Sequence, residues 1–171
     1  ATAYFDVTLN PANDLKFERI ANTPRRGLGE SSLKSLHQLA RAHNVPLMQA
    51  ARLIVETEEL KPKSRKALAD LIAAFDRWRS MIDTMRHTEL AELILDESGY
   101  TAMWQAEKSP QAQSKLENSK ELIRFMEEFD TLAGFMEHVS LVMDAESEEG
   151  TERVNLMTLH SAKGLEFDTV F

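Results

Sequence analysis

The sequence contains no cysteine, which excludes a disulfide framework and any thiolate metal site. It has only six glycines and five prolines in 171 residues, too few for a fibrous or disordered chain. The apolar runs are a few residues long, far shorter than a membrane span, and the N-terminus lacks the basic-then-apolar layout of a signal peptide. We therefore expect a soluble, cytoplasmic protein with no membrane partner.

The apolar residues recur at helical spacing through most of the chain. Hydrophobic residues make up 43% of the sequence, enough for the core of one domain with or without appendages. The pattern predicts a mainly α fold, with helices over residues 14–21, 31–42, 47–55, 64–85, 90–95, 100–107, 113–129 and 132–143. Residues 1–9 also have helical character. The 64–85 segment keeps its period over more than five turns, so we expect it to be the spine of the domain.

Glycine and proline mark the predicted helix boundaries. Pro24 should end the 14–21 helix, Pro46 suits the first turn of the next one, and Gly99 is a candidate C-terminal cap. Pro110 is expected to break the chain. Among the aromatic residues on these stripes, Trp78 is assigned to the core, while for Trp104 both core packing and base stacking stay open.

Signatures of catalysis are also missing from the sequence. No phosphate-cradling GxxxxGK[ST] string occurs, and Lys163-Gly164 has the wrong order for one. The five histidines have no HExxH spacing, and Ser161 lacks the flanking glycines of a nucleophile elbow. We expect no metal site, no bound cofactor and no catalysis by this chain alone.

The charge is unevenly distributed along the sequence. The net charge of −8 argues against a nucleic-acid partner, because Lys and Arg drive phosphate binding. Residues 19–41, however, hold five basic side chains and one acid, Glu30, and Lys61, Lys63, Arg65 and Lys66 form a second basic cluster. Acids concentrate in residues 144–152, a run typical of a solvated linker.

The segment from Pro24 to Gly29 combines glycines with basic residues. It resembles the hairpin of helix-hairpin-helix DNA-binding elements, in which backbone N–H groups approach a phosphate of duplex DNA. Ser31 opens the following helix, whose N-terminus adds unpaired donors. The candidate duplex-binding residues are Arg25, Arg26, Gly27, Leu28, Gly29 and Ser31. The alternative interpretation is a plain loop followed by a capped helix.

The C-terminal segment VNLMTLHSAKGLEFDTVF, residues 154–171, has the pattern of a strand, a polar turn and a second extended piece. It closely resembles motif V of the UvrD/Rep/PcrA-type superfamily 1 DNA helicases. A second block matches the entry to the 2B subdomain of the same family, from Asn10-Pro11 to the Gly27-Leu28-Gly29 turn, with Leu28 in place of the commoner isoleucine.

The resemblance implies roles for individual residues. Thr158, His160 and Ser161 match positions that approach single-stranded DNA, and Gly164 and Glu166 match positions that face the nucleotide. ATP and Mg²⁺ would be bound by the parent helicase, in motor domains outside this chain.

We therefore expect a fragment, because both ends of the sequence look cut. Residues 1–10 would end a 2A-like motor segment, 11–145 would form the helical 2B-like subdomain, 146–153 an acidic linker, and 154–171 the strand–loop–strand of motif V. The implied parent is an ATP-dependent 3′-to-5′ DNA helicase of repair or replication. A helical protein-interaction or regulatory module without DNA contact is the alternative. The sequence leaves the oligomeric state open.

Overall fold

The computed structural model describes residues 1–147, with side chains up to residue 142. These residues form nine α-helices and, within that range, no strand. They are α1 (Thr2–Leu9), α2 (Asp14–Ala21), α3 (Glu30–His43), α4 (Leu47–Ile54), α5 (Pro62–Met81), α6 (His87–Glu97), α7 (Tyr100–Ala106), α8 (Pro110–Met126) and α9 (Leu132–Ser147). The mainly α prediction is confirmed for this part of the chain. Residues 1–139 form one compact unit, and residues 140–171 belong to a second one.

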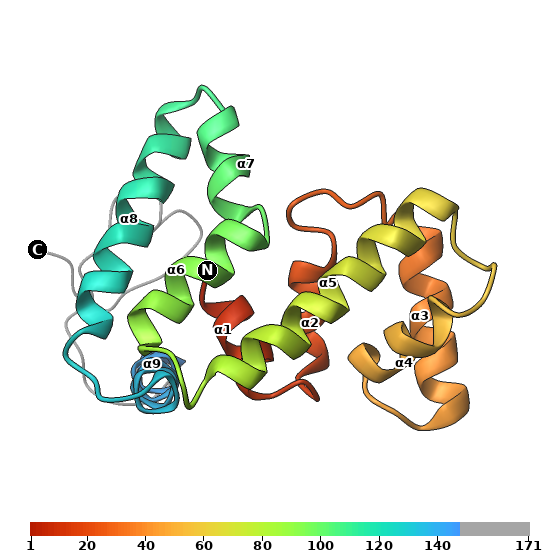
Figure 1. Ribbon diagram of the computed structural model, residues 1–171, viewed down its shortest axis with the longest axis horizontal. Helices are drawn as coiled ribbons and strands as arrows, with labels where there is room; N and C mark the ends of the chain where they lie inside the picture. The colour runs from red at the N-terminus through yellow and green to blue at the C-terminus, as the bar shows by residue number, and fades with distance from the viewer. Residues whose placement is uncertain (148–171) are drawn as a thin grey trace, which may run out of the picture. The chain divides into compact units, whose positions relative to one another are not determined.

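The first unit is built around α1 and α5. Helix α1 contacts α2, α5 and α6, and Figure 1 shows it in the middle of this unit, with α5 running past it. Tyr4 of α1 stacks on Phe75 of α5 at a ring-centroid distance of 6.1 Å, and Trp78 meets both rings edge-on. All three side chains are buried, and burying a large apolar side chain stabilises the fold by roughly 2–3 kcal/mol. Thus α5 is the spine that its apolar period predicts.

Residues 1–10 were expected to belong to a different segment from the helical subdomain. In the structure, Phe5 and Val7 of α1 are fully buried in the same hydrophobic core as α2 and α5. The boundary at residue 10 stays a prediction about the parent, but α1 packs as part of this unit. At the other end, α9 continues to Ser147, so the first two residues of the predicted acidic linker are helical.

Several helix boundaries differ from their predictions. Helix α5 ends at Met81, four residues early, because the chain turns there while Ile82 and Met85 still pack against the core. Pro110 begins α8 instead of breaking the chain: the Ser109 side chain accepts a hydrogen bond from the Ala112 N–H, and a first-turn proline needs no hydrogen bond of its own.

Other details of the pattern hold in the structure. Gly99, which follows the C-cap residue Ser98 of α6, has φ +79°, as expected for a C-terminal glycine. Trp78 is fully buried, which confirms its assignment to the core. Phe125 is an exception to its apolar stripe, being 40% exposed at the end of α8.

Candidate nucleic-acid interface

The loop between α2 and α3 is shaped by the side chain of Asn22. Its Nδ2 donates to the Leu28 carbonyl (2.6 Å), and its Oδ1 accepts from the N–H groups of Arg26 (2.8 Å) and Leu28 (3.3 Å). One carboxamide therefore closes residues 22–28 into a compact turn, as asparagine often does by imitating a backbone peptide. No role for Asn22 was predicted from the sequence, although its place directly after a helix is typical of such a turn.

Gly27 lies within this turn, in a conformation that favours glycine. Its φ is +77°, and its carbonyl accepts a hydrogen bond from Ser64 Oγ of α5 at 2.9 Å. A Cβ atom added to Gly27 would lie 3.1 Å from the same Oγ. Ser64 is buried, so this contact attaches the turn to the first helical turn of α5.

Gly29 differs from Gly27, because nothing in the part of the chain that the structure describes explains its missing side chain. Its φ of −83° suits any residue, and an added Cβ would meet no atom of the described residues within 4 Å. Gly29 is the N-cap residue of α3, which has no side-chain cap. The space beside it is open, so another molecule can come close to the first amides of this helix.

The amides of the turn fall into two groups. Those of Arg26 and Leu28 are used by Asn22, whereas those of Gly27 and Gly29 donate no hydrogen bond within residues 1–147. The free amides belong to exposed residues. Only the free group is available to an anion.

Three predicted contact residues have contrasting surroundings. Arg25 is exposed and takes part in no ion pair or hydrogen bond within the part of the chain that the structure describes. The Leu28 side chain is only 3% exposed and packs in the core, so only its backbone lies at the turn. Ser31 is exposed in the first turn of α3.

The Arg26 side chain points into the protein. Its Nη1 donates to the carbonyl oxygens of Ile20 (2.9 Å), Pro24 (3.2 Å) and Ala21 (3.4 Å). Its Nη2 donates to Tyr4 Oη and to the Ser98 carbonyl, both at 2.8 Å. The two neighbouring arginines of the motif therefore occupy opposite environments.

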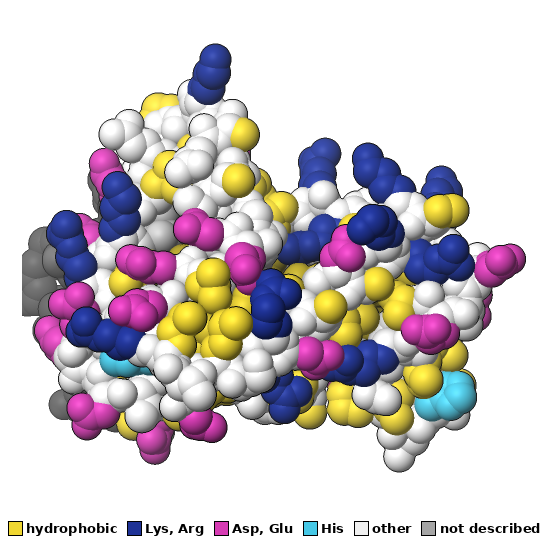
Figure 2. All heavy atoms as spheres, in the orientation of Figure 1, with side chains coloured by type: hydrophobic (Ala, Val, Ile, Leu, Met, Phe, Trp, Pro, Cys, Tyr) yellow, Lys and Arg dark blue, Asp and Glu magenta, His cyan; other side chains and the backbone are white. Residues whose placement is uncertain are grey.

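The tertiary structure joins the two basic clusters of the sequence. Because Ser64 binds the Gly27 carbonyl, Lys61 and Lys63 at the start of α5 are brought close to the turn, and both are exposed. In Figure 2, Lys and Arg side chains gather over the α2–α3 loop and the start of α5, while Asp and Glu are more frequent over α6 and α8. The first turn of α5 contains no acid.

Not every charge near the turn is positive or free. Glu30, exposed in the first turn of α3, places a carboxylate beside the open amides. Lys66 pairs with Asp70 at 3.0 Å, and Arg65 donates to the Thr57 carbonyl at 2.9 Å. Arg25, Lys61 and Lys63 are thus the cations best placed for an anionic partner.

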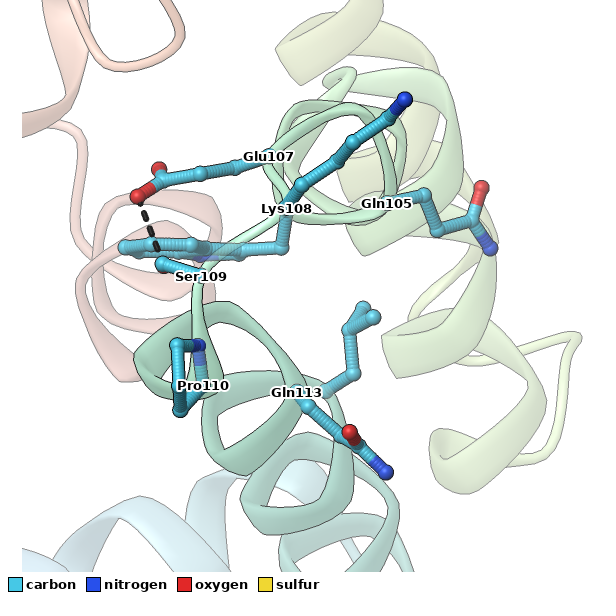
Figure 3. A pocket seen from close by; sticks show the side chains of 8 residues that line it. Gln105, Glu107, Lys108, Ser109, Pro110 and Gln113 are labelled. Carbon is cyan, nitrogen blue, oxygen red and sulfur yellow. Dashed lines mark hydrogen bonds between the residues drawn. The ribbon is translucent and has the colours of Figure 1, made fainter.

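A separate pocket of about 440 Å³ lies where α7 meets α8. Figure 3 shows Glu107, Lys108 and Ser109 in the connection between the helices, with Ser109 Oγ donating to the Glu107 carboxylate at 2.8 Å. Trp104 also lines the pocket, and its ring meets Tyr100 edge-on at 6.2 Å. Its buried Nε1 has no hydrogen-bond partner in the described region. Trp104 is therefore half-buried, and both interpretations, core packing and base stacking, stay open.

Other kinds of site find no support in residues 1–147. The structure there brings together no group of three or more His, Asp or Glu side chains suited to a metal ion. None of the helices in the same range has the length and apolarity needed to cross a bilayer. The predicted motif V residues Thr158, His160, Ser161, Gly164 and Glu166 lie outside the described residues.

Comparison with known proteins identifies the family. Residues 1–171 match the family described as UvrD-like helicase C-terminal domain. The chain belongs to this family. The resemblance to UvrD/Rep/PcrA-type helicases is thereby confirmed.

Several DNA helicases are similar to almost the whole chain. A DNA helicase II of Rickettsia typhi is 40% identical over 171 residues, which cover 99% of this chain and 26% of that protein. The ATP-dependent DNA helicase PcrA of Bacillus subtilis is 36% identical, with coverage of 99% and 24%. For the ATP-dependent DNA helicase UvrD1 of Mycobacterium tuberculosis the identity is 35%, with coverage of 99% and 25%. The chain thus spans about a quarter of the length of these relatives.

Proposed function

We propose that this chain is part of an ATP-dependent 3′-to-5′ DNA helicase of repair or replication, and that its helical unit binds duplex DNA phosphates through the Gly27–Gly29 turn. The observation that carries the proposal is the pair of amides at Gly27 and Gly29, which have no hydrogen-bond partner among residues 1–147, where Gly29 also has open space beside it. Membership of a helicase family, and relatives named as DNA helicases, support the nature of the partner.

The chemistry of the turn suits a DNA backbone. A phosphate oxygen accepts hydrogen bonds from backbone N–H groups, and the N-terminus of α3 adds the positive end of a helix dipole. Arg25, Lys61 and Lys63 add full charges around these donors. Such contacts position a protein on the duplex without reading its sequence. Glu30 opposes phosphate binding, so a modest affinity is expected.

The remaining motor parts of the parent would supply the energy. ATP and Mg²⁺ require a phosphate-cradling loop and metal-binding acids, and residues 1–147 present neither. We therefore assign ATP hydrolysis to other domains and expect no ATPase activity from this chain alone. In the parent, motif V would contact single-stranded DNA through Thr158, His160 and Ser161, and the nucleotide through Gly164 and Glu166.

Duplex binding at several salt concentrations tests the proposal. Fluorescence anisotropy with a labelled blunt duplex is compared for the wild type, Arg25→Ala and Arg124→Ala. Arg124 is the matched control, because it is an exposed arginine of α8 with no ion pair among the described residues. Arg25→Ala should weaken binding about three- to tenfold at low salt and reduce the slope of log K against log salt by about 0.9.

The control variant should change neither quantity measurably. Equal binding by the wild type and Arg25→Ala, or no salt-dependent binding at all, would remove the basis of the DNA proposal. The alternative of a protein-interaction module predicts that second outcome.

A further inference from the structure

Arg26 lies where the C-terminal ends of two helices meet. Ile20 and Ala21 end α2, and Ser98 is the C-cap residue of α6; the carbonyls of all three accept hydrogen bonds from the Arg26 guanidinium. Helix C-termini carry partial negative charge on their unpaired carbonyls, so two of them together make a favourable place for a cation. These partial charges therefore favour the inward orientation of the Arg26 guanidinium.

Almost all N–H groups of the Arg26 side chain already donate hydrogen bonds within the protein. The two Nη atoms carry four N–H groups, and these serve five acceptors in α1, α2, the turn and the α6–α7 junction. Only Nε–H is left for another partner. The bidentate contact that arginine makes with a phosphate would require these bonds to break.

Tyr4 extends this network into the core. Its hydroxyl accepts from Arg26 and donates to the Thr23 carbonyl at 2.6 Å, so both residues hold the segment that leads into the turn. Burial raises the pKa of the Tyr4 phenol above its ordinary value, although the Arg26 charge acts in the opposite direction. The phenol therefore stays protonated and able to donate at neutral pH.

We propose that Arg26 is a positioning residue, which holds the turn against α1 and the α6–α7 junction so that the Gly27 and Gly29 amides face outward, and that it makes no phosphate contact itself. The inference rests on the proposed function for its effect on DNA binding. Its structural part, the retention of the turn, is independent of DNA.

Lysine substitution distinguishes positioning from phosphate contact. A lysine keeps the charge that a phosphate contact needs, but its single ammonium cannot reach acceptors spread over four segments as the planar guanidinium does. Arg26→Lys is therefore expected to weaken duplex binding at least about tenfold. Arg124→Lys, the matched control at an exposed arginine of α8 outside the proposed DNA surface, should stay within about twofold of the wild type.

Amide hydrogen exchange supplies a readout that does not involve DNA. Arg26→Lys and Tyr4→Phe should both speed exchange at the Arg26 and Leu28 N–H groups, which Asn22 protects in the intact turn. Exchange in α8 should not change. All variants are compared at a temperature where circular dichroism shows them to be fully folded, and Tyr4→Phe tests the same network if Arg26→Lys is unstable.

Each outcome has a definite meaning. Weaker binding together with faster exchange in Arg26→Lys supports the positioning role. Wild-type affinity in Arg26→Lys, or weaker binding with unchanged exchange, overturns it. If Arg25→Ala also leaves duplex binding unchanged, the proposed function has failed, and the exchange data alone decide whether Arg26 retains the turn.

Discussion

Replacing Gly29 by serine should raise the stability of the fold and weaken duplex binding. The backbone of Gly29 suits any residue, and within residues 1–147 the new Cβ would meet no atom closer than 4 Å. Serine is a better N-cap than glycine by a few tenths of a kcal/mol, and it also lowers the entropy of the unfolded chain, worth about 0.4–1 kcal/mol in comparable replacements. The free energy of unfolding should therefore rise by about 0.5–1 kcal/mol.

The same hydroxyl should interfere with a phosphate. It would accept a hydrogen bond from an amide in the first turn of α3 and fill the open space beside residue 29. Losing one hydrogen bond to a charged group costs about 1.5–3 kcal/mol, which corresponds to a roughly tenfold or greater loss of duplex affinity.

Thermal unfolding and anisotropy measure the two effects separately. In a chain of 171 residues the midpoint temperature should rise by about 1–4 °C, while the duplex dissociation constant increases. Ser109→Gly is the matched control, because it removes the N-cap side chain of α8 and should lower stability slightly without altering duplex binding. A Gly29→Ser variant that is stabilised and binds duplex as tightly as the wild type would show that phosphates do not approach Gly29.

Three other side chains allow further tests. Ser64→Ala, which removes the bond to the Gly27 carbonyl, should lower the unfolding free energy by about 1 kcal/mol in denaturant titrations and weaken duplex binding; unchanged binding would mean that the turn does not need this attachment. Glu30→Gln should strengthen duplex binding roughly two- to fivefold at low salt, an effect that 0.5 M salt should abolish if it is electrostatic. Glu97→Ala should destabilise the fold by about 1–3 kcal/mol, because it leaves the buried Trp78 Nε1 without its 2.7 Å acceptor. Near-ultraviolet circular dichroism should report the change at Trp78. A spectrum identical to that of the wild type would contradict this prediction.

The stabilisation contributed by the Glu97 carboxylate depends on pH. Burial disfavours its ionised form, but hydrogen bonds from Arg77 and Trp78 and the Arg77 charge outweigh burial, so its pKa lies below the ordinary glutamate value. A depressed pKa in the folded state means that the stabilisation is complete above the unfolded-state pKa and is lost as the pH falls through the folded-state pKa. The Trp78 signal should therefore change in acid, and Glu97→Gln should remove that transition.

Local pattern was enough to predict the helices of this domain. Residues 14–21 were predicted to the residue, because an apolar stripe, a helix-favouring composition and a following proline all act within one or two turns. The end of α5 could not be predicted from the local apolar pattern. Met81, Ile82 and Met85 keep the apolar period while the backbone leaves the helix, since a turn packed against the core can bury them as well.

The candidate site was only partly predictable, because its parts are distant in sequence. The Gly27–Gly29 turn and its basic neighbours are visible as a motif, and family resemblance gives them a meaning. The contribution of Ser64, 37 residues away, is not visible, because the hydrogen bond to Gly27 exists only once α5 packs beside the turn.

The sequence by itself determined the helical class, the family and the place of the glycine turn, because these depend on short-range periodicity and on a contiguous motif. It could not distinguish Arg25 from Arg26, two identical side chains next to each other. The tertiary structure decided between them: Tyr4 and Ser98, 22 and 72 residues from Arg26, place acceptors at its guanidinium, whereas Arg25 has no such partner among the described residues. A guanidinium is directed by the oxygens that surround it, and those oxygens are assembled by folding.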